Sequence, residues 1–110
     1  MLEDGGTSQT GGINWILVCP GCGGTYLHHG VVNTFDRDED AENGRHVRIG
    51  RGVVIDHDLR NNPSFRRGGL TITFSCETCS AESTLRIAQH KGQTFVTLDV
   101  TRQRPEGVGP

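Results

Sequence analysis

Four cysteines are the residues with the clearest chemistry in this 110-residue chain. They form two C-x-x-C pairs, at Cys19 and Cys22 and at Cys76 and Cys79, and no cysteine is left over. Two intervening residues let a turn aim both sulfurs at one point, at a Zn–S distance of about 2.3 Å. This pattern is typical of a zinc ribbon. It predicts one structural Zn²⁺ ion with these four thiolates as ligands, which would leave no coordination position for water.

The spacing between the two pairs departs from the common pattern. Fifty-three residues separate Cys22 from Cys76, whereas about 15–20 are usual. Loop-closure entropy grows slowly with length, so the longer loop costs only about 1 kcal/mol more. Structural zinc contributes roughly 10–16 kcal/mol of apparent binding free energy. The long insertion is therefore compatible with a zinc site, and we expect it to form strands of its own.

Two other uses of the cysteines compete with zinc. A disulfide framework suits a secreted chain, but the N-terminal residues lack the basic-then-apolar pattern of a signal peptide. A redox C-x-x-C pair needs the N-terminus of a helix to stabilise its thiolate, and neither pair precedes a helical pattern.

The histidines offer weaker candidate sites. His28 and His29 closely follow Cys22, so one of them could replace a cysteine or bind a second metal. As neighbours on a strand they would point to opposite faces, and the alternative is one packed and one exposed ring. Asp56-His57-Asp58 resembles a metal or proton-transfer group, although three consecutive side chains rarely converge. No P-loop or H-E-x-x-H motif is present. We expect no catalytic residues, and an enzyme with a His-based site is the least favoured function.

The charge is distributed unevenly along the chain. Residues 1–43 carry one base and seven acids, whereas residues 44–104 carry ten bases and five acids. Six arginines fall within 23 residues and could contact phosphates or a partner: Arg45, Arg48, Arg51, Arg60, Arg66 and Arg67. Against nucleic-acid binding stand the net charge of −2 and an aromatic content of only 5%. Nucleic-acid binding through this basic region is therefore the alternative function.

The composition favours β-structure over helix. Thr, Val and Ile are plentiful, whereas Ala and Lys, which favour helices, number only three and one. We predict an all-β, mainly antiparallel, zinc-ribbon-like domain with two knuckles and a β-rich insertion between them. Ile13–Val18 is expected to be a central strand covered on both faces, and Arg45–Ile55 a single strand with Arg45 and Arg51 on one face. The other predicted strands are Thr25–Phe35, Leu70–Cys76, Ser83–Gln89 and Thr94–Val100.

The expected organisation is one small domain between two tails. Residues 13–100 form the domain, and residues 1–12 and 101–110 are small, polar and expected to be disordered. The acidic stretch Asp36–Gly44 is expected to be a solvated loop. No apolar run approaches the about 18 residues of a membrane span. We therefore expect a cytoplasmic location and no membrane partner.

Several stretches together resemble one group of proteins. CPGCGGTYLHH, FDRDEDAENG, NPSFRRGGLTITFSCETC and IAQHKGQT are similar to segments of small, largely uncharacterised zinc-ribbon proteins of actinobacterial phages, prophages and mobile elements. The resemblance covers roughly residues 15–100. It implies a phage-borne, metal-binding protein in the host cytoplasm, with the four cysteines as ligands and no specific activity. The favoured function is therefore a non-enzymatic module that docks on a host or phage protein, with exposed sheet edges that could also pair two copies into a homodimer.

Overall fold

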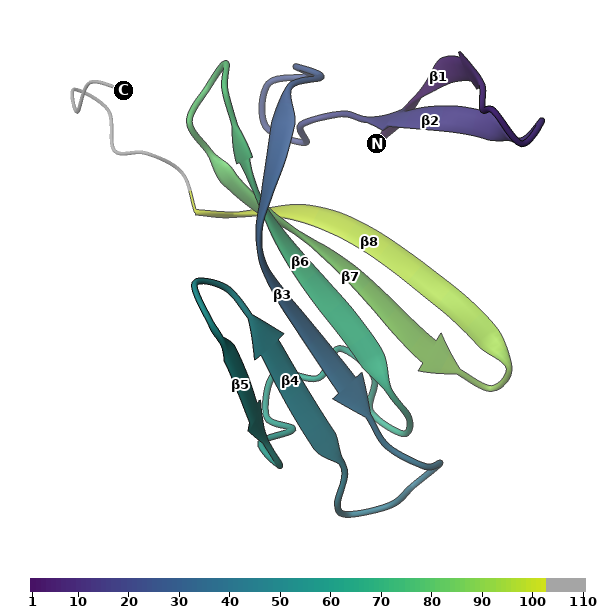
Figure 1. Ribbon diagram of the computed structural model, residues 1–110, viewed down its shortest axis with the longest axis vertical. Coiled ribbons are helices and arrows are strands. Elements are labelled where there is room, and N and C mark those ends of the chain that lie inside the picture. Colours follow the sequence, from purple (N-terminus) through teal and green to yellow (C-terminus); the bar gives the residue numbers. More distant parts are fainter. Residues whose placement is uncertain (103–110) are drawn as a thin grey trace.

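The computed structural model describes residues 1–102, which form eight strands in two antiparallel sheets and no helix (Figure 1). The predicted all-β, antiparallel class is confirmed. The smaller sheet pairs β1 (Leu2–Thr7) with β2 (Ile13–Leu17). The larger sheet has the order β5-β4-β3-β6-β7-β8. Its strands are β3 (Leu27–Asp36), β4 (Arg45–Ile49), β5 (Val53–Asp56), β6 (Gly69–Cys76), β7 (Glu82–His90) and β8 (Gln93–Arg102).

The hairpin between β7 and β8 follows directly from its turn residues. His90 pairs with Gln93 across a two-residue turn of Lys91 and Gly92. Both turn residues have positive φ, 50° and 76°, which is the geometry of a type I′ turn whose twist matches the flanking strands. A short hairpin loop therefore joins β7 to β8. The alternation of Val96 and Leu98 with polar residues then sets the register, because Leu98 lies opposite Leu85.

The predicted single strand from Arg45 to Ile55 is wrong, because the chain reverses in its middle. Gly50-Arg51-Gly52 forms a turn, in which the Gly50 N–H donates to the Gly52 carbonyl at 3.0 Å. β4 and β5 therefore pair with each other, with Val47 opposite Ile55. Arg51 lies at the tip of this hairpin, so it does not share a strand face with Arg45. Gly50 and Gly52 allow the chain to reverse because glycine has few backbone restrictions. The apolar alternation continues on both sides of the turn, so the sequence pattern resembled one long strand.

The N-terminal region also differs from expectation. Residues 2–7, expected to be disordered, form β1 and pair with β2. The apolar run beginning at Ile13 is not central, since β2 pairs only with β1, in a ribbon that stands apart from the main sheet (Figure 1). Ile13 and Trp15 are 64% and 57% exposed. At the other end, Thr101 and Arg102 belong to β8, and the remainder of the expected C-terminal tail, 103–110, lies outside the described residues.

The buried core of the described chain is small. Its buried apolar side chains are Cys19, Phe35, Cys76 and Ala81. The loop 57–68 crosses one face of the sheet, where the buried Ser64 hydroxyl donates to the Gln89 carbonyl at 2.6 Å. Two of the four apolar core residues are cysteines, so the sulfur cluster occupies much of the core that this sheet has. Within residues 1–102 there is also no helix that could cross a membrane.

Candidate metal centre

Two knuckles meet at one end of the main sheet because of the register between β3 and β6. The first knuckle, residues 19–24, precedes β3, and the second, residues 76–81, follows β6. β3 pairs with β6 so that Leu27 lies opposite Cys76. The Glu77 N–H then donates to the Tyr26 carbonyl at 3.0 Å. Strand pairing thus brings together two cysteine pairs that are distant in sequence.

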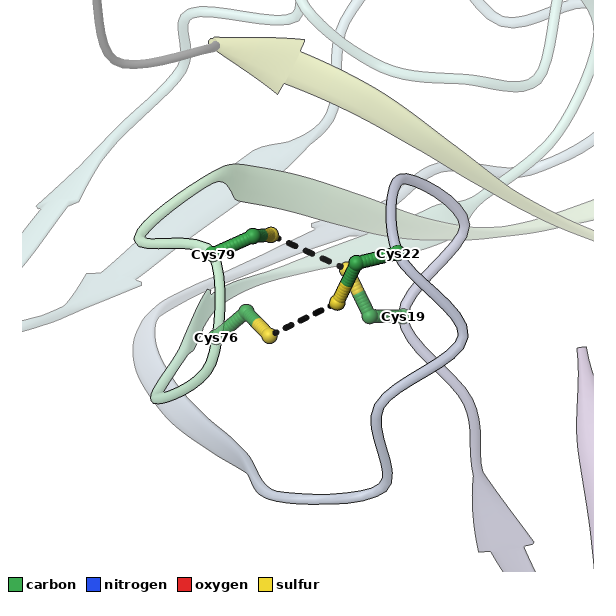
Figure 2. A group of neighbouring side chains, drawn as sticks. All are labelled: Cys19, Cys22, Cys76 and Cys79. Atoms are coloured by element: carbon green, nitrogen blue, oxygen red, sulfur yellow. Dashed lines mark hydrogen bonds between the residues drawn. The ribbon is translucent and has the colours of Figure 1, made fainter.

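The four sulfurs form a compact group (Figure 2). Cys19 Sγ lies 3.7 Å from Cys79 Sγ, and Cys22 Sγ lies 3.6 Å from Cys76 Sγ. All four sulfurs lie within 4.8 Å of one another. A tetrahedral zinc ion with Zn–S bonds of about 2.3 Å requires S···S separations of about 3.8 Å. The predicted convergence of Cys19, Cys22, Cys76 and Cys79 on a metal-sized space is therefore present, and the four cysteines are free thiols.

The two knuckles share one backbone pattern. In the first, the Gly23 N–H donates to the Cys19 carbonyl and the Cys19 N–H donates to the Gly24 carbonyl. In the second, the Ser80 N–H donates to the Cys76 carbonyl and the Cys76 N–H donates to the Ala81 carbonyl. In addition, the N–H groups of Gly21 and Gly24 each point at a sulfur, at 3.4 Å. These donors favour the thiolate form, which is the form that binds metal.

The thiols perturb one another's pKa values in opposite directions. Burial would raise the pKa of Cys76, but hydrogen bonds from the backbone N–H groups of Cys79 and Thr78 outweigh burial and lower this pKa to about 7. The Ala81 N–H lowers the pKa of Cys79, but burial and hydrogen bonds with the other three thiols outweigh it and raise that pKa to about 12. Four thiols this close cannot all ionise alone, because their negative charges repel. A bound divalent cation would offset this repulsion and allow all four thiols to ionise.

Neither histidine of the His28-His29 pair belongs to the sulfur cluster. Both lie on β3 and are exposed, and as strand neighbours they point to opposite faces. His28 Nε2 lies 2.8 Å from Glu77 Oε2, so it ties β3 to the second knuckle. His29 lies opposite Phe74. Among the described residues, the four cysteines form the one group with metal-ligand geometry.

The side chains of Asp56-His57-Asp58 do not converge. Asp56 Oδ1 lies 2.8 Å from His46 Nδ1, His57 Nδ1 lies 2.7 Å from the Gly44 carbonyl oxygen, and Asp58 binds Arg60 through both oxygens. The Asp58 pKa is lowered to about 2, first by its hydrogen bonds with the Arg60 side chain. The run therefore contributes three separate contacts and no shared site.

Sequence reasoning missed His46, whose side chain is only 12% exposed. Its ring stacks on Phe35 with a centroid distance of 4.8 Å, and its Nε2 lies 2.7 Å from Asn33 Oδ1. His46 thereby links β3, β4 and, through Asp56, β5. The alternation of side chains in β4 could have identified His46, because it places this residue on the face opposite Val47. On that face His46 lies beside Phe35.

The six arginines do not form one free basic surface. Three of them are paired with carboxylates: Arg45 with Asp36, Arg60 with Asp58 and Arg66 with Asp40. The Arg66–Asp40 pair is bidentate, at 2.8 and 2.6 Å, and lies between the acidic loop and the loop 57–68. These pairs reduce the positive charge that Arg45, Arg60 and Arg66 could offer to phosphates. The nucleic-acid alternative, including the contribution of Arg48, Arg51 and Arg67, stays a prediction.

Comparisons with protein families, with curated proteins and with solved structures found no match to this chain. The geometry of the cysteine cluster is therefore the strongest indication of what the chain binds.

Proposed function

We propose that this chain is a non-enzymatic binding module whose fold is held together by one structural Zn²⁺ ion and which docks on another protein. The observation that supports zinc is the convergence of four thiols, all within 4.8 Å, from two knuckles of matching backbone. A tetrahedral site of four sulfurs is typical of zinc or of iron. Four thiolates would complete the shell of a zinc ion, which favours a structural role over a catalytic one.

Zinc would compensate for the small core. The ion would join the knuckle before β3 to the knuckle after β6, which lie on neighbouring strands of the sheet. Cys19 and Cys76 are already among the few buried apolar side chains. Domains that cannot bury enough apolar surface commonly rely on metal or disulfide cross-links. The zinc site would therefore supply a large share of the folding free energy.

The β1–β2 ribbon is the surface that we propose for docking. Ile13, Trp15 and Leu17 alternate along β2 and so share one face, and Leu2 lies opposite Leu17. Large exposed aromatic and aliphatic side chains on a projecting ribbon are typical anchors of protein interfaces. Asp4 lies opposite Trp15 on this face, and residues 1–12 contain no base. The partner surface that fits is an apolar pocket with a basic rim.

The biological setting belongs to the same proposal. A protein of a phage or mobile element, acting on a host protein in the cytoplasm, would fit a small module of this kind. We favour protein docking over nucleic-acid binding because half of the basic region is engaged in ion pairs.

Metal analysis of the purified chain tests the zinc proposal. We expect one zinc per chain by elemental analysis, and a Co²⁺-substituted sample should show the visible absorption bands of a tetrahedral thiolate site. A metal-free chain that still unfolds cooperatively would contradict the proposal. Iron in place of zinc would retain the four ligands but exclude the stated metal.

Affinity purification from the native host cell tests docking. The full chain and its Trp15→Ala variant are compared by quantitative mass spectrometry, with Phe65→Ala as the matched control. Phe65 is 94% exposed but lies far along the chain from the ribbon. We expect one stoichiometric partner that is lost with Trp15→Ala and retained with Phe65→Ala. Equal recovery by both variants would show that the ribbon is not the docking surface.

A further inference from the structure

One face of the six-stranded sheet is apolar from edge to edge. The strand registers align two rows of six side chains across β5, β4, β3, β6, β7 and β8. Eleven of these twelve side chains are Val, Ile or Leu, and none is charged. We call them the apolar face: Val53, Ile49, Val32, Ile72, Leu85 and Leu98 in one row, and Ile55, Val47, Thr34, Leu70, Ile87 and Val96 in the other.

Nothing in the described chain covers the apolar face. None of its twelve residues is buried, and Ile55 and Val96 at its two edges are 65% and 44% exposed. The loop 57–68 lies on the opposite face, where Ser64 and Phe65 border the same hollow as Ala88 and Phe95. The first knuckle reaches only the end of the sheet, since Gly21 lies against Val100. The central rows therefore face solvent.

The opposite face has a different character. Two rows cross the same six strands on that face. One row, which contains the buried Phe35, consists of Asp56, His46, Phe35, Gly69, Ala88 and Phe95. The other row consists of Val54, Arg48, Asn33, Thr71, Arg86 and Thr97. Five of these six residues are polar or charged. The sheet thus has one side that is apolar throughout and one side of mixed character, part of which the loop 57–68 already covers. A sheet of this kind normally buries its apolar face against another layer of structure.

The chain exposes more surface than a compact monomer of its mass. Its accessible surface is 7685 Å², whereas a folded monomer of 12.0 kDa exposes about 6,000 Å². Its radius of gyration is 15.8 Å, against about 13 Å for a compact domain of this length. The surplus includes the projecting ribbon as well as the apolar face. It is large enough to accommodate the roughly 800 Å² that each partner buries in a standard dimer.

We propose that two copies of this chain pack their apolar faces together and form a homodimeric β-sandwich. Ile49, Val53, Ile55 and Val96 are 44–65% exposed, and the other eight side chains of the apolar face are partly exposed. Two such faces packed together would bury on the order of 1,000 Å², at the lower limit of specific interfaces. A second copy is the occupant that this face fits. It carries no charge, so a two-fold axis brings no like charges together. Two similarly twisted sheets also pack well, about 10 Å apart and within about 30° of alignment.

The oligomeric state of the zinc-loaded chain tests this proposal. Sedimentation velocity and light scattering at about 100 μM should give a mass of twice 12.0 kDa. The test variants are Ile55→Lys and Val96→Lys, at opposite edges of the apolar face. Because both side chains are already well exposed in one copy, lysine should leave the fold of that copy intact. We expect each variant to weaken dimerisation at least tenfold, and the double variant to be monomeric.

The matched controls are Val54→Lys and Thr97→Lys. Each replaces the sequence neighbour of a test residue, and each lies on the same strand but on the opposite face of the sheet. Both control variants should remain dimeric. Circular dichroism and zinc content of all variants establish that they are folded, so a loss of mass cannot be attributed to unfolding.

Three outcomes would overturn the proposal. The first is a wild-type chain that is monomeric at about 100 μM, which would leave the face for another protein or for the chain's own ribbon. The second is a dimer that survives the double variant, which would indicate pairing elsewhere, such as along the free edge of β8. The third is equal dissociation by test and control variants.

In a mixed-label sample, intermolecular methyl contacts at Ile72 and Leu85 would locate the interface directly. None of these measurements involves the ribbon's partner, so they stand apart from the test of docking.

Discussion

Gly23 and Ser80 occupy equivalent positions in the two knuckles. Each is the fourth residue after the first cysteine of its pair, and each donates its N–H to that cysteine's carbonyl, at 2.9 and 3.0 Å. Each has a positive φ, 78° for Gly23 and 61° for Ser80. The chain therefore builds the same turn twice, once with a residue that adopts this conformation freely and once with a residue that is strained by it.

This relationship predicts unequal effects of exchanging the two residues. Gly23→Ala should lower the free energy of unfolding by about 1–2 kcal/mol, because an L-residue is strained at this φ. The methyl group itself meets open space. Ser80→Gly should be close to neutral, because relief of strain offsets the greater entropy of glycine in the unfolded chain. Chemical denaturation of the zinc-loaded variants measures both effects.

Gly52→Ala is the control for Gly23→Ala. Gly52 also has open space around its Cα, but its φ is not positive. Its replacement should change the unfolding free energy by less than about 0.5 kcal/mol. Equal losses at Gly23 and Gly52 would contradict the assignment of the cost to backbone conformation.

Removal of one ligand should abolish the folded state. Cys76→Ser replaces a buried thiolate by a poor zinc ligand, and much of the roughly 10 kcal/mol that structural zinc supplies would be lost. That loss is comparable to the whole stability of a small domain. Thermal unfolding with and without a chelator measures it. We expect a poorly folded variant whose unfolding no longer responds to the chelator.

His29→Ala is the matched control for Cys76→Ser. His29 is exposed and lies outside the sulfur cluster, so its loss should change the melting temperature by only a few degrees. A zinc content below one per chain in His29→Ala would instead assign this histidine to the site.

Zinc binding should strengthen as the pH rises. In the metal-free chain the pKa of Cys79 is raised to about 12, that of Cys22 lies above its usual value, and that of Cys76 is about 7. At pH 7 the first two thiols hold their protons, so zinc binding must release at least two protons. The metal-free state binds more protons, and zinc-dependent stability therefore increases with pH.

Competition with a chelator of known affinity at several pH values measures this dependence. Two released protons correspond to about a hundredfold increase in apparent zinc affinity per pH unit near neutrality. Calorimetry in buffers of different ionisation enthalpy counts the protons independently. An affinity that is flat between about pH 6 and 8 would rule out coordination by the thiolates.

The ion pair between Arg66 and Asp40 should order the acidic loop. Arg66→Ala removes both hydrogen bonds to Asp40, and amide hydrogen exchange in residues 37–44 should become faster. Global stability should change little, because both side chains are substantially exposed and solvent screens the pair. Arg67→Ala, which removes the neighbouring guanidinium, should leave exchange in this loop unchanged. Identical exchange in the two variants would show that the pair does not restrain the loop.

The Arg66 hydrogen bonds also lower the pKa of Asp40. Because the folded-state pKa lies below the unfolded value of about 4, the contribution of the pair is complete above that pH and is lost as the pH falls through the folded pKa. The restraint on the acidic loop should therefore be constant from about pH 5 to 8, which includes the pH range of the zinc experiments.

The sequence alone determined most of the strands and the four candidate metal ligands. The alternation of apolar and polar residues around Leu70, Leu85 and Val96 specified which side chains share a face, because side chains on a strand repeat with a period of two. The two C-x-x-C pairs identified the four sulfurs, because the spacing within each pair is a local property of the turn. Lys91-Gly92 likewise specified its hairpin through local backbone preferences.

Only the tertiary structure decided which strands pair and which apolar surfaces are covered. The pairing of Leu27 with Cys76 brings the knuckles together, and such long-range registers are not visible in local patterns. An apolar run indicates that a surface avoids water but not what covers it, so Ile13 and Trp15 were expected in a core and lie on an exposed ribbon. For the same reason, the alternation in β4 to β8 indicated an inner face, whereas in a single copy that face has no covering layer.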